Sequence, residues 1–427
     1  MKAKLTHFLR LGVHSEAEYF QKAKPLYDAL ILNANLVQAT PAASAALVYR
    51  LEKPFFIDPF THAFSLSPQY LMSKSKGKSQ VSRIKRSFQG LSDKYFSNAA
   101  FLGERRLTEA DFSISEFTKS VLEYQDNVLA STGAELVNLM GAKPELFKPR
   151  WLIAPYFPLR KSLEWLETNI SCLHSAIDSE YSERVCAILP VEFGALKAAE
   201  GWKTIADRYC DLKPKVIFLW IESFDEDQAS EDDLNIYCSF VRRINDKGIK
   251  VVNLFGGFFS CLAECVGLSG FAHGLVYGEN KSFTPVVGGG QPPPRYYFKT
   301  AHIAMNVRGA ELLLGSVSPS KYLSEVCGCT ICYGLFNAQD DLTHFAQFAE
   351  ANDQGKFMPR AYALCRYHFL FARDAEIRTM SGLVLGDRIA LIEENITFLR
   401  DIGADNYAEH LATWINVINT NCALNRP

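Results

Sequence analysis

Three cysteines within six residues constrain the fold of this chain more than any other feature. They are Cys327, Cys329 and Cys332 in the run CGCTIC, and the chain has eleven cysteines in all. Zinc favours four nitrogen or sulfur ligands in a tetrahedron, and thiolates this close can face one ion only if the backbone turns tightly. Gly328 is able to take the positive φ that such a turn uses. The run predicts a structural Zn2+ site, and the alternative is a chance run in a cysteine-rich chain.

A fourth ligand must come from farther along the chain, where two histidines are available. His344 lies in DLTHFAQF and His368 lies in CRYHFLFARDAEI. Apolar residues at helical spacing mark a packed face beside His368, which is therefore our choice. A histidine on such a face is as often a core residue with hydrogen-bond partners inside the protein as it is a metal ligand. We predict that His368 completes the zinc site with the three cysteines.

Composition and charge exclude several classes of protein. Of all residues 48% are apolar and 22% are charged, and the formal net charge is −2, which is typical of a globular chain rather than a disordered or strongly basic one. The N-terminal residues lack the uninterrupted apolar region of a signal peptide, so reduced cysteines and a cytoplasmic location are expected. The apolar stretch 251–277 contains Glu264 and His273, which favours buried strands and a helix over a membrane span.

Short apolar runs recur along the chain, each followed by turn residues and in most cases by a helical pattern. This order is typical of parallel βα units. Eight runs fit, and they span residues 27–32, 54–57, 151–154, 185–189, 216–221, 250–254, 273–277 and 296–299. In the crossover after the fifth run, Ser230 suits the start of a helix and Gly248 its end. Eight such units predict a (β/α)8 TIM barrel of the α/β class.

The periodicity divides the chain into parts. Residues 1–315 are predicted to form the barrel, residues 61–149 a helical insertion within it, and residues 316–427 a zinc-binding helical subdomain. The insertion is too long for a compact βα loop. It opens with the basic stretch SKSKGKSQVSRIKR, which would either neutralise phosphates or form a solvated loop.

The cysteine run, a linker and a histidine that opens a helix of the type HNLxFY, placed after the last strand of a (β/α)8 barrel, resemble the zinc subdomain of the tRNA-guanine transglycosylases. His368 with Phe369, Leu370 and Phe371 occupies the place of that helix start. The resemblance implies a transferase that exchanges a guanine in nucleic acid for a 7-deazaguanine through a covalent intermediate. It implies tRNA or DNA and a 7-deazaguanine base as partners, no membrane, and a homodimer or heteromeric complex.

Polar residues at the carboxyl ends of the predicted strands are the candidates for chemistry, because barrel enzymes place their sites there. Asp58 is the leading catalytic candidate, by position in the family and because base exchange needs a carboxylate at the sugar C1′, and Glu222 is the second. The candidates for substrate binding are Tyr156, Glu192, Gly256 and Gly257, with Glu279 and His302 at neighbouring strand ends. The alternatives are that Asp58 caps a turn before a proline and that the glutamates are loop charges.

Two departures from the family pattern limit this interpretation. The family's nucleophilic aspartate lies in a motif like FDxVxPTRxAR near the last strand, whereas this chain reads RYYFKTAHIAMNVRG, and the run DSGGFQ is absent. Either Asp58 or a glutamate has taken over the attack, or the chain is a non-catalytic paralogue that binds nucleic acid or an active enzyme. A third reading is an unrelated zinc-stabilised barrel enzyme for a small molecule.

The run GGGQPPPRYYF overlaps the start of the segment RYYFKTAHIAMNVRG. Its glycines and prolines predict a rigid loop, and its arginine and tyrosines suit a nucleic-acid groove. The alternative is a tight connection whose tyrosines belong to the core.

Overall fold

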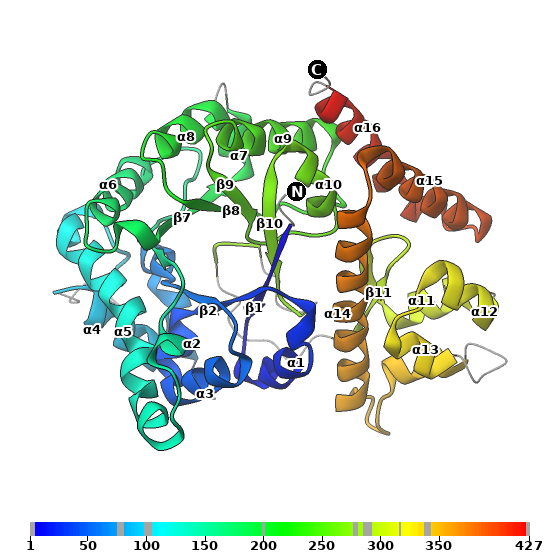
Figure 1. The fold of residues 1–427 in the computed structure, drawn as a ribbon, viewed down its shortest axis with the longest axis horizontal. Helices are drawn as coiled ribbons and strands as arrows, with labels where there is room; N and C mark the ends of the chain where they lie inside the picture. The colour runs from blue at the N-terminus through cyan, green and yellow to red at the C-terminus, as the bar shows by residue number, and fades with distance from the viewer. Residues whose placement is uncertain are drawn as a thin grey trace.

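Eight parallel strands form a nearly closed barrel in the computed structural model, which describes residues 5–74, 81–97, 105–198, 201–275, 281–284, 293–315, 317–336 and 343–423 (Figure 1). The strands are β1 (Thr6–Leu11), β2 (Ala29–Asn33), β3 (Phe55–Asp58), β6 (Leu152–Ile153), β7 (Val185–Glu192), β8 (Val216–Glu222), β9 (Lys250–Asn253) and β10 (Leu268–His273). Their order is β3-β2-β1-β10-β9-β8-β7-β6. Between β6 and β3, Arg150 N donates to Phe55 O at 2.9 Å. The predicted (β/α)8 fold is confirmed.

Helices follow the strands and surround the barrel (Figure 1). They are α1 (Ala17–Lys22), α2 (Ala34–Ala39), α3 (Pro41–Leu51), α6 (Leu166–Ile177), α7 (Phe193–Lys197), α8 (Gly201–Cys210), α9 (Glu231–Asn245) and α10 (Phe259–Leu262). The predicted start of α9 at Ser230 is confirmed, whereas its C-terminal cap is Asp246, two residues before the predicted Gly248. Ser230 Oγ accepts a hydrogen bond from Asp233 N at 3.2 Å, and Gly248 has φ +78° beyond the last turn.

The insertion between β3 and β6 is mostly helical. It contains a hairpin of β4 (Met72–Lys74) and β5 (Val81–Ile84), then α4 (Arg86–Tyr95) and the long α5 (Ile114–Met140). Tyr95 and Tyr124 join the two helices, with ring centroids 5.4 Å apart. The predicted basic stretch runs through this hairpin, and its lysines at 76 and 78 lie outside the described residues.

The part of the chain after the barrel begins with an antiparallel hairpin and continues as helices. Its elements are β11 (Arg295–Phe298), β12 (Ile303–Asn306), α11 (Val307–Leu314), α12 (Pro319–Lys321), a short π-helical turn η9 (Tyr322–Val326), α13 (Thr330–Phe336), η10 (Thr343–Ala349), α14 (Pro359–Gly382), α15 (Leu385–Asp401) and α16 (Glu409–Ala423). Helix α14 stands beside β1 and β10 in Figure 1. The Phe369 ring lies 5.0 Å from His273, and the Arg373 guanidinium lies 6.0 Å from Phe271. Helix α14 therefore covers the barrel where its eighth helix is needed.

Two of the predicted strands were wrong. Residues 296–299 belong to the β11–β12 hairpin outside the barrel, and residues 273–277 overlap β10 only at His273. The strand missing from the prediction is β1, whose polar residues interrupt its apolar run. His7 and Arg10 are nevertheless buried, at 2% and 8% exposure, because both find partners inside the protein.

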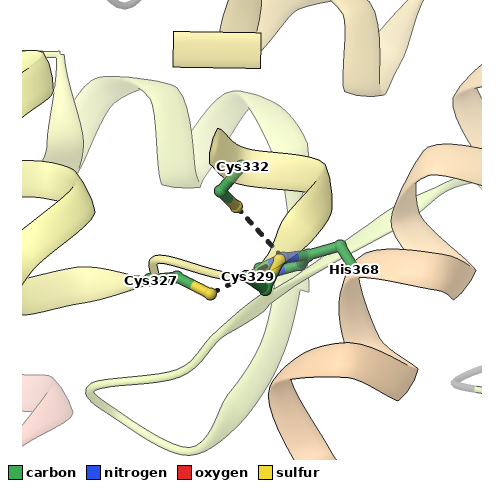
Figure 2. Close-up of side chains that lie close together, drawn as sticks. All are labelled: Cys327, Cys329, Cys332 and His368. Atoms are coloured by element: carbon green, nitrogen blue, oxygen red, sulfur yellow. Dashed lines mark hydrogen bonds between the residues drawn. The ribbon is translucent and has the colours of Figure 1, made fainter. Parts of the chain in front are cut away.

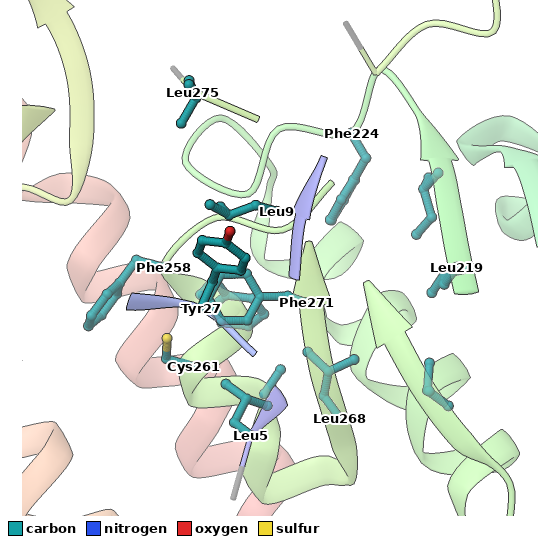
Figure 3. Close-up of a cluster of buried hydrophobic side chains, with 14 of the residues drawn as sticks. Leu5, Leu9, Tyr27, Leu219, Phe224, Phe258, Cys261, Leu268, Phe271 and Leu275 are labelled. Atoms are coloured by element: carbon teal, nitrogen blue, oxygen red, sulfur yellow. The ribbon is translucent and has the colours of Figure 1, made fainter. Parts of the chain in front are cut away.

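The core has two layers. One fills the barrel interior with side chains such as Phe8, Phe56, Phe218 and Trp220. The other lies between the strands and the surrounding helices, and Figure 3 shows part of it around Leu9, Tyr27 and Phe271. Because alternate residues of a strand face opposite layers, each barrel strand is apolar on both sides.

Nine cysteines are free thiols, and Cys265 with Cys422 forms a disulfide between the barrel and α16. This pair departs from the expectation of reduced cysteines throughout, and its separation of 157 residues left no pattern to read in the sequence. Among the described residues, no helix combines the length and apolar character that a membrane span requires.

Candidate metal centre and barrel mouth

The four predicted metal ligands lie together in the C-terminal region (Figure 2). His368 Nδ1 lies 3.9 Å from Cys327 Sγ, 3.3 Å from Cys329 Sγ and 3.2 Å from Cys332 Sγ, and all four donor atoms lie within 4.8 Å of one another. Tetrahedral zinc with ordinary bond lengths would separate sulfur and nitrogen donors by about 3.6 Å. The donor set therefore fits a four-coordinate metal ion.

A tight backbone turn presents the three cysteines. Cys327 follows η9 directly, and Cys332 lies in the first turn of α13. Gly328 does not have the positive φ that we predicted. A Cβ at this position would lie 2.9 Å from Leu323 O, so the turn needs glycine for a close backbone approach.

A second set of contacts orients the histidine. His368 Nε2 donates to Tyr297 O on β11 at 2.7 Å, which leaves Nδ1 as the lone-pair donor that faces the sulfur atoms. The Tyr296 ring stacks on the imidazole with centroids 4.5 Å apart. The Tyr322 hydroxyl lies 3.2 Å from Cys332 Sγ, where it can donate to a thiolate. Such supporting contacts are typical of real metal sites.

The barrel mouth carries a layer of polar side chains above the apolar interior. Phe8, Phe56 and Trp220 face inward, so the residues two positions later on β1, β3 and β8 face inward as well. Those residues, with their counterparts on β2 and β7, are Arg10, Asn33, Asp58, Glu192 and Glu222. This is the end of the barrel at which enzymes of this fold place their chemistry.

Asp58 is the most enclosed member of this layer, at 0% exposure. Its Oδ1 accepts from the Tyr156 hydroxyl at 2.6 Å and from Phe60 N at 3.1 Å, and its Oδ2 accepts from Arg10 Nη2 at 3.3 Å. Burial and the neighbouring Asp58 raise the pKa of Tyr156 well above its ordinary value, so this phenol stays protonated and donates. The prediction thus brought Asp58 and Tyr156 together, and the bond to Phe60 shows that Asp58 also caps the turn after β3.

Arg10 is the cation beside Asp58 and was missed in the sequence. It contacts Asp58 and Asn33, with 3.1 Å between Nη2 and Asn33 Oδ1, and its guanidinium lies 4.6 Å from the centre of the Phe255 ring. Its Nη1 is buried without a hydrogen-bond partner among the described residues. The only signal was an arginine in a segment that we did not recognise as a strand.

His62 is a second residue that the sequence did not indicate. It is 0% exposed, its Nδ1 lies 3.2 Å from the Tyr156 hydroxyl, and its ring packs on Trp220 at 4.8 Å. Burial lowers the pKa of His62 to about 4, against a smaller opposing effect of Asp58. His62 is therefore neutral at physiological pH.

Glu192 and Glu222 are register partners at the ends of β7 and β8. Glu222 Oε1 accepts from Phe283 N at 3.1 Å, and its Oε2 lies 3.8 Å from Arg160 Nη1. Phe283 is 0% exposed and packs 5.0 Å from Trp220. Lys281 O, two residues earlier, accepts from Trp220 Nε1 at 2.8 Å. Residues 281–284 therefore cover this side of the mouth.

Gly256 and Gly257 form the turn after β9, where their N–H groups already have partners. Gly256 N donates to Ala272 O, and Gly257 N donates to Glu226 Oε2 at 2.9 Å. A Cβ on Gly257 would lie 2.7 Å from that oxygen, and one on Gly256 would lie 2.5 Å from Ser260 Oγ. Close packing around the buried Glu226 accounts for both glycines, and burial raises the pKa of Glu226.

Two other strand-end residues were candidates, Glu279 and His302. Glu279 lies outside the described residues. His302 lies beside the C-terminal helices, where its Nδ1 is 2.7 Å from Glu376 Oε1 on α14 and its Nε2 faces Asn395 on α15. His302 therefore joins the β11–β12 hairpin to α14.

No protein-family model matches the chain, and no curated protein matches it. The fold and the two clusters of side chains therefore carry the functional argument.

Proposed function

We propose that this chain is a zinc-stabilised barrel enzyme that exchanges a guanine for a 7-deazaguanine in nucleic acid. The observation that carries the proposal is the buried carboxylate of Asp58 at the barrel mouth, held by Arg10 and Tyr156. A fixed carboxylate next to a cation suits an attack on a sugar carbon that develops positive charge. The metal cluster after the barrel gives the chain the same two parts as the family that its sequence resembles.

In the proposed reaction Asp58 is the nucleophile. Its carboxylate oxygen attacks C1′, the bond from C1′ to N9 of guanine breaks, and Glu222 as the acid gives the departing base a proton. The incoming 7-deazaguanine then loses its proton to Glu222 and attacks C1′, which releases Asp58. Arg10 and Tyr156 orient the carboxylate through their hydrogen bonds. Phe283 must withdraw for a base to reach this layer.

The proposed metal is Zn2+. Three thiolates and one imidazole are the soft and borderline ligands that zinc prefers, and all four positions are filled by the protein, as in a structural site. The ion would join the cysteine turn to α14, the helix that covers β1 and β10. Its proposed role is therefore to hold the barrel closed, with no part in the chemistry at the mouth.

One observation favours a second candidate, a non-catalytic relative that binds nucleic acid or an active enzyme. Both oxygens of Asp58 already have partners, and Phe283 packs into the mouth against Trp220. The Asp58 carboxylate therefore has its partners without a substrate. The two candidates differ in whether any base is exchanged.

The test is incorporation of labelled guanine into tRNA and into duplex DNA by the purified protein. We expect the wild type to label one of them and Asp58→Asn to lose at least about a hundredfold in rate. Asp126→Asn is the matched control, because Asp126 is also a buried aspartate with two cationic partners, Lys148 and Arg184, but lies on α5. Binding of nucleic acid by the wild type without incorporation would establish the second candidate, and full activity of Asp58→Asn would exclude Asp58 as the nucleophile.

A further inference from the structure

A pocket of about 430 Å³ lies beside the barrel mouth. Its walls come from the segment after β3, the segment after β6 and Thr284 of the covering segment. Arg160 connects the pocket to the mouth, because it lines the pocket and its Nη1 lies 3.8 Å from Oε2 of Glu222 at the end of β8. If a nucleic-acid strand placed one nucleotide in the mouth, its neighbouring nucleotide would lie at this pocket.

The pocket has an excess of positive charge. Arg106 and Arg160 line it together with a single carboxylate, Glu164. Arg106 is exposed and makes no ion pair within the part of the chain that the structure describes, whereas its neighbour Arg105 is paired with Asp111. A planar guanidinium presents parallel N–H donors that match two oxygens of a phosphate.

The remaining lining suits a sugar–phosphate unit. Tyr70 and Thr284 offer hydroxyl groups, and the wall is completed by the indole of Trp165. Trp165 is held in place by stacking on Phe157, with ring centroids 4.3 Å apart. Hydroxyl donors and a fixed aromatic wall beside two guanidinium groups are the chemistry with which proteins hold a nucleic-acid backbone.

We propose that this pocket binds the phosphodiester next to the nucleotide that enters the barrel mouth, with Arg106 and Arg160 on the phosphate oxygens. The proposal rests on the proposed function, because it assigns the same nucleic acid a second contact. Glu164 limits the affinity of this subsite, since its carboxylate faces the same phosphate.

The test is binding of a fluorescein-labelled single-stranded oligonucleotide, of tRNA and of duplex DNA, followed by anisotropy at 50 to 300 mM KCl, conditions chosen because phosphate contacts weaken steeply with salt over about this range. Arg106→Gln and Arg160→Gln are each expected to weaken binding about tenfold at low salt and to reduce the salt slope by about one. Glu164→Gln is expected to strengthen binding about threefold, which gives the test an effect of opposite sign.

Arg150→Gln is the matched control. Arg150 is an exposed arginine that precedes β6, so it lies at the opposite end of the barrel. Equal melting temperatures for all four variants would show that the fold is intact. Of the two arginines, Arg160 contacts Glu222 and Arg106 does not. The Arg106→Gln variant therefore tests the subsite independently of Glu222.

The outcomes separate this proposal from the proposed function. If the wild type binds nucleic acid and Arg106→Gln binds it as tightly as Arg150→Gln does, the subsite is overturned. The proposal of base exchange is then untouched. Weaker binding by Glu164→Gln also overturns it, because the ligand would then be a donor to that carboxylate. No binding of any of the three nucleic acids by the wild type overturns both proposals.

Discussion

The metal cluster and the barrel mouth are both buried and polar, yet they are balanced in different ways. In the metal cluster four donor atoms converge on one point, and His368 turns its lone pair toward three sulfur atoms. In the mouth the carboxylate of Asp58 already has a cation, a phenol and a backbone N–H as partners. The donors of the cluster are arranged to fit an ion, whereas the Asp58 carboxylate finds its partners within the protein. Binding of a substrate at Asp58 must therefore displace existing contacts.

The largest expected effect concerns the metal cluster. Cys329→Ser removes one ligand and should release the ion, and structural zinc contributes on the order of 10 kcal/mol of folding free energy in small modules. We expect a large fall in melting temperature and loss of protection of α14 in hydrogen exchange. Cys365→Ser is the control, because Cys365 is a buried free thiol on the same helix and is not a ligand. Equal melting of Cys329→Ser and wild type would break the comparison.

Removal of one member of the Asp58–Arg10 pair should have the next largest effect on the free energy of unfolding. Asp58→Asn leaves the Arg10 guanidinium buried without its carboxylate, and breaking such a pair costs about 3 kcal/mol or more. The measurement is urea unfolding of Asp58→Asn, Arg10→Met and the double variant. We expect the double variant to be more stable than the sum of the two single losses predicts. Strict additivity would mean that the two side chains do not interact.

The pH dependence of stability probes the neutral histidine of the mouth. Because burial lowers the pKa of His62 to about 4 from its ordinary value of 6.5, the unfolded chain binds more protons than the folded chain between these two values. The contribution of His62 is complete above about pH 6.5 and is lost as pH falls toward 4.

Unfolding measured at pH 7.5, 6 and 5 should therefore show a weaker dependence on pH in His62→Gln than in the wild type. His174→Gln, at an exposed position on α6, should follow the wild type. An unchanged pH profile for His62→Gln would contradict a neutral His62.

The smallest effect expected here comes from the glycine turn. Gly256→Ala would bring a Cβ to 2.7 Å from Phe271 Cβ, and such overpacking costs about 1–3 kcal/mol. Gly334→Ala on α13 meets nothing within 4 Å and should stabilise by about 0.5–1 kcal/mol. Chemical denaturation measures both. If Gly256→Ala left stability unchanged but weakened substrate binding, the glycine would line a base pocket as the sequence suggested.

The same contrast explains what the sequence could predict. Metal ligation imposes short spacing, so Cys327, Cys329 and Cys332 were visible as a group, and His368 was visible from its helix. The strand pattern was enough to predict a barrel because most of its strands are apolar on both faces. Asp58 and Tyr156 were visible as strand-end residues, although their contact depends on the order of β3 and β6 in the barrel.

Other features depended on contacts that leave no local pattern. Arg10 was missed because the polar residues of β1 hide a strand whose charges are matched by distant partners. Phe283 belongs to a loop, and only its packing on Trp220 gives it a role. Helix α14 takes the place of the eighth barrel helix from far along the chain, so it lay outside the repeat of strand and helix that we followed.

The most direct test of this account is elemental analysis of the purified protein, with Cys329→Ser and Cys365→Ser beside the wild type. We predict one zinc ion per chain in the wild type and in Cys365→Ser, and none in Cys329→Ser. A wild type without stoichiometric metal, or a Cys329→Ser variant that retains its full metal content, would contradict the claim that these four residues hold a structural zinc ion.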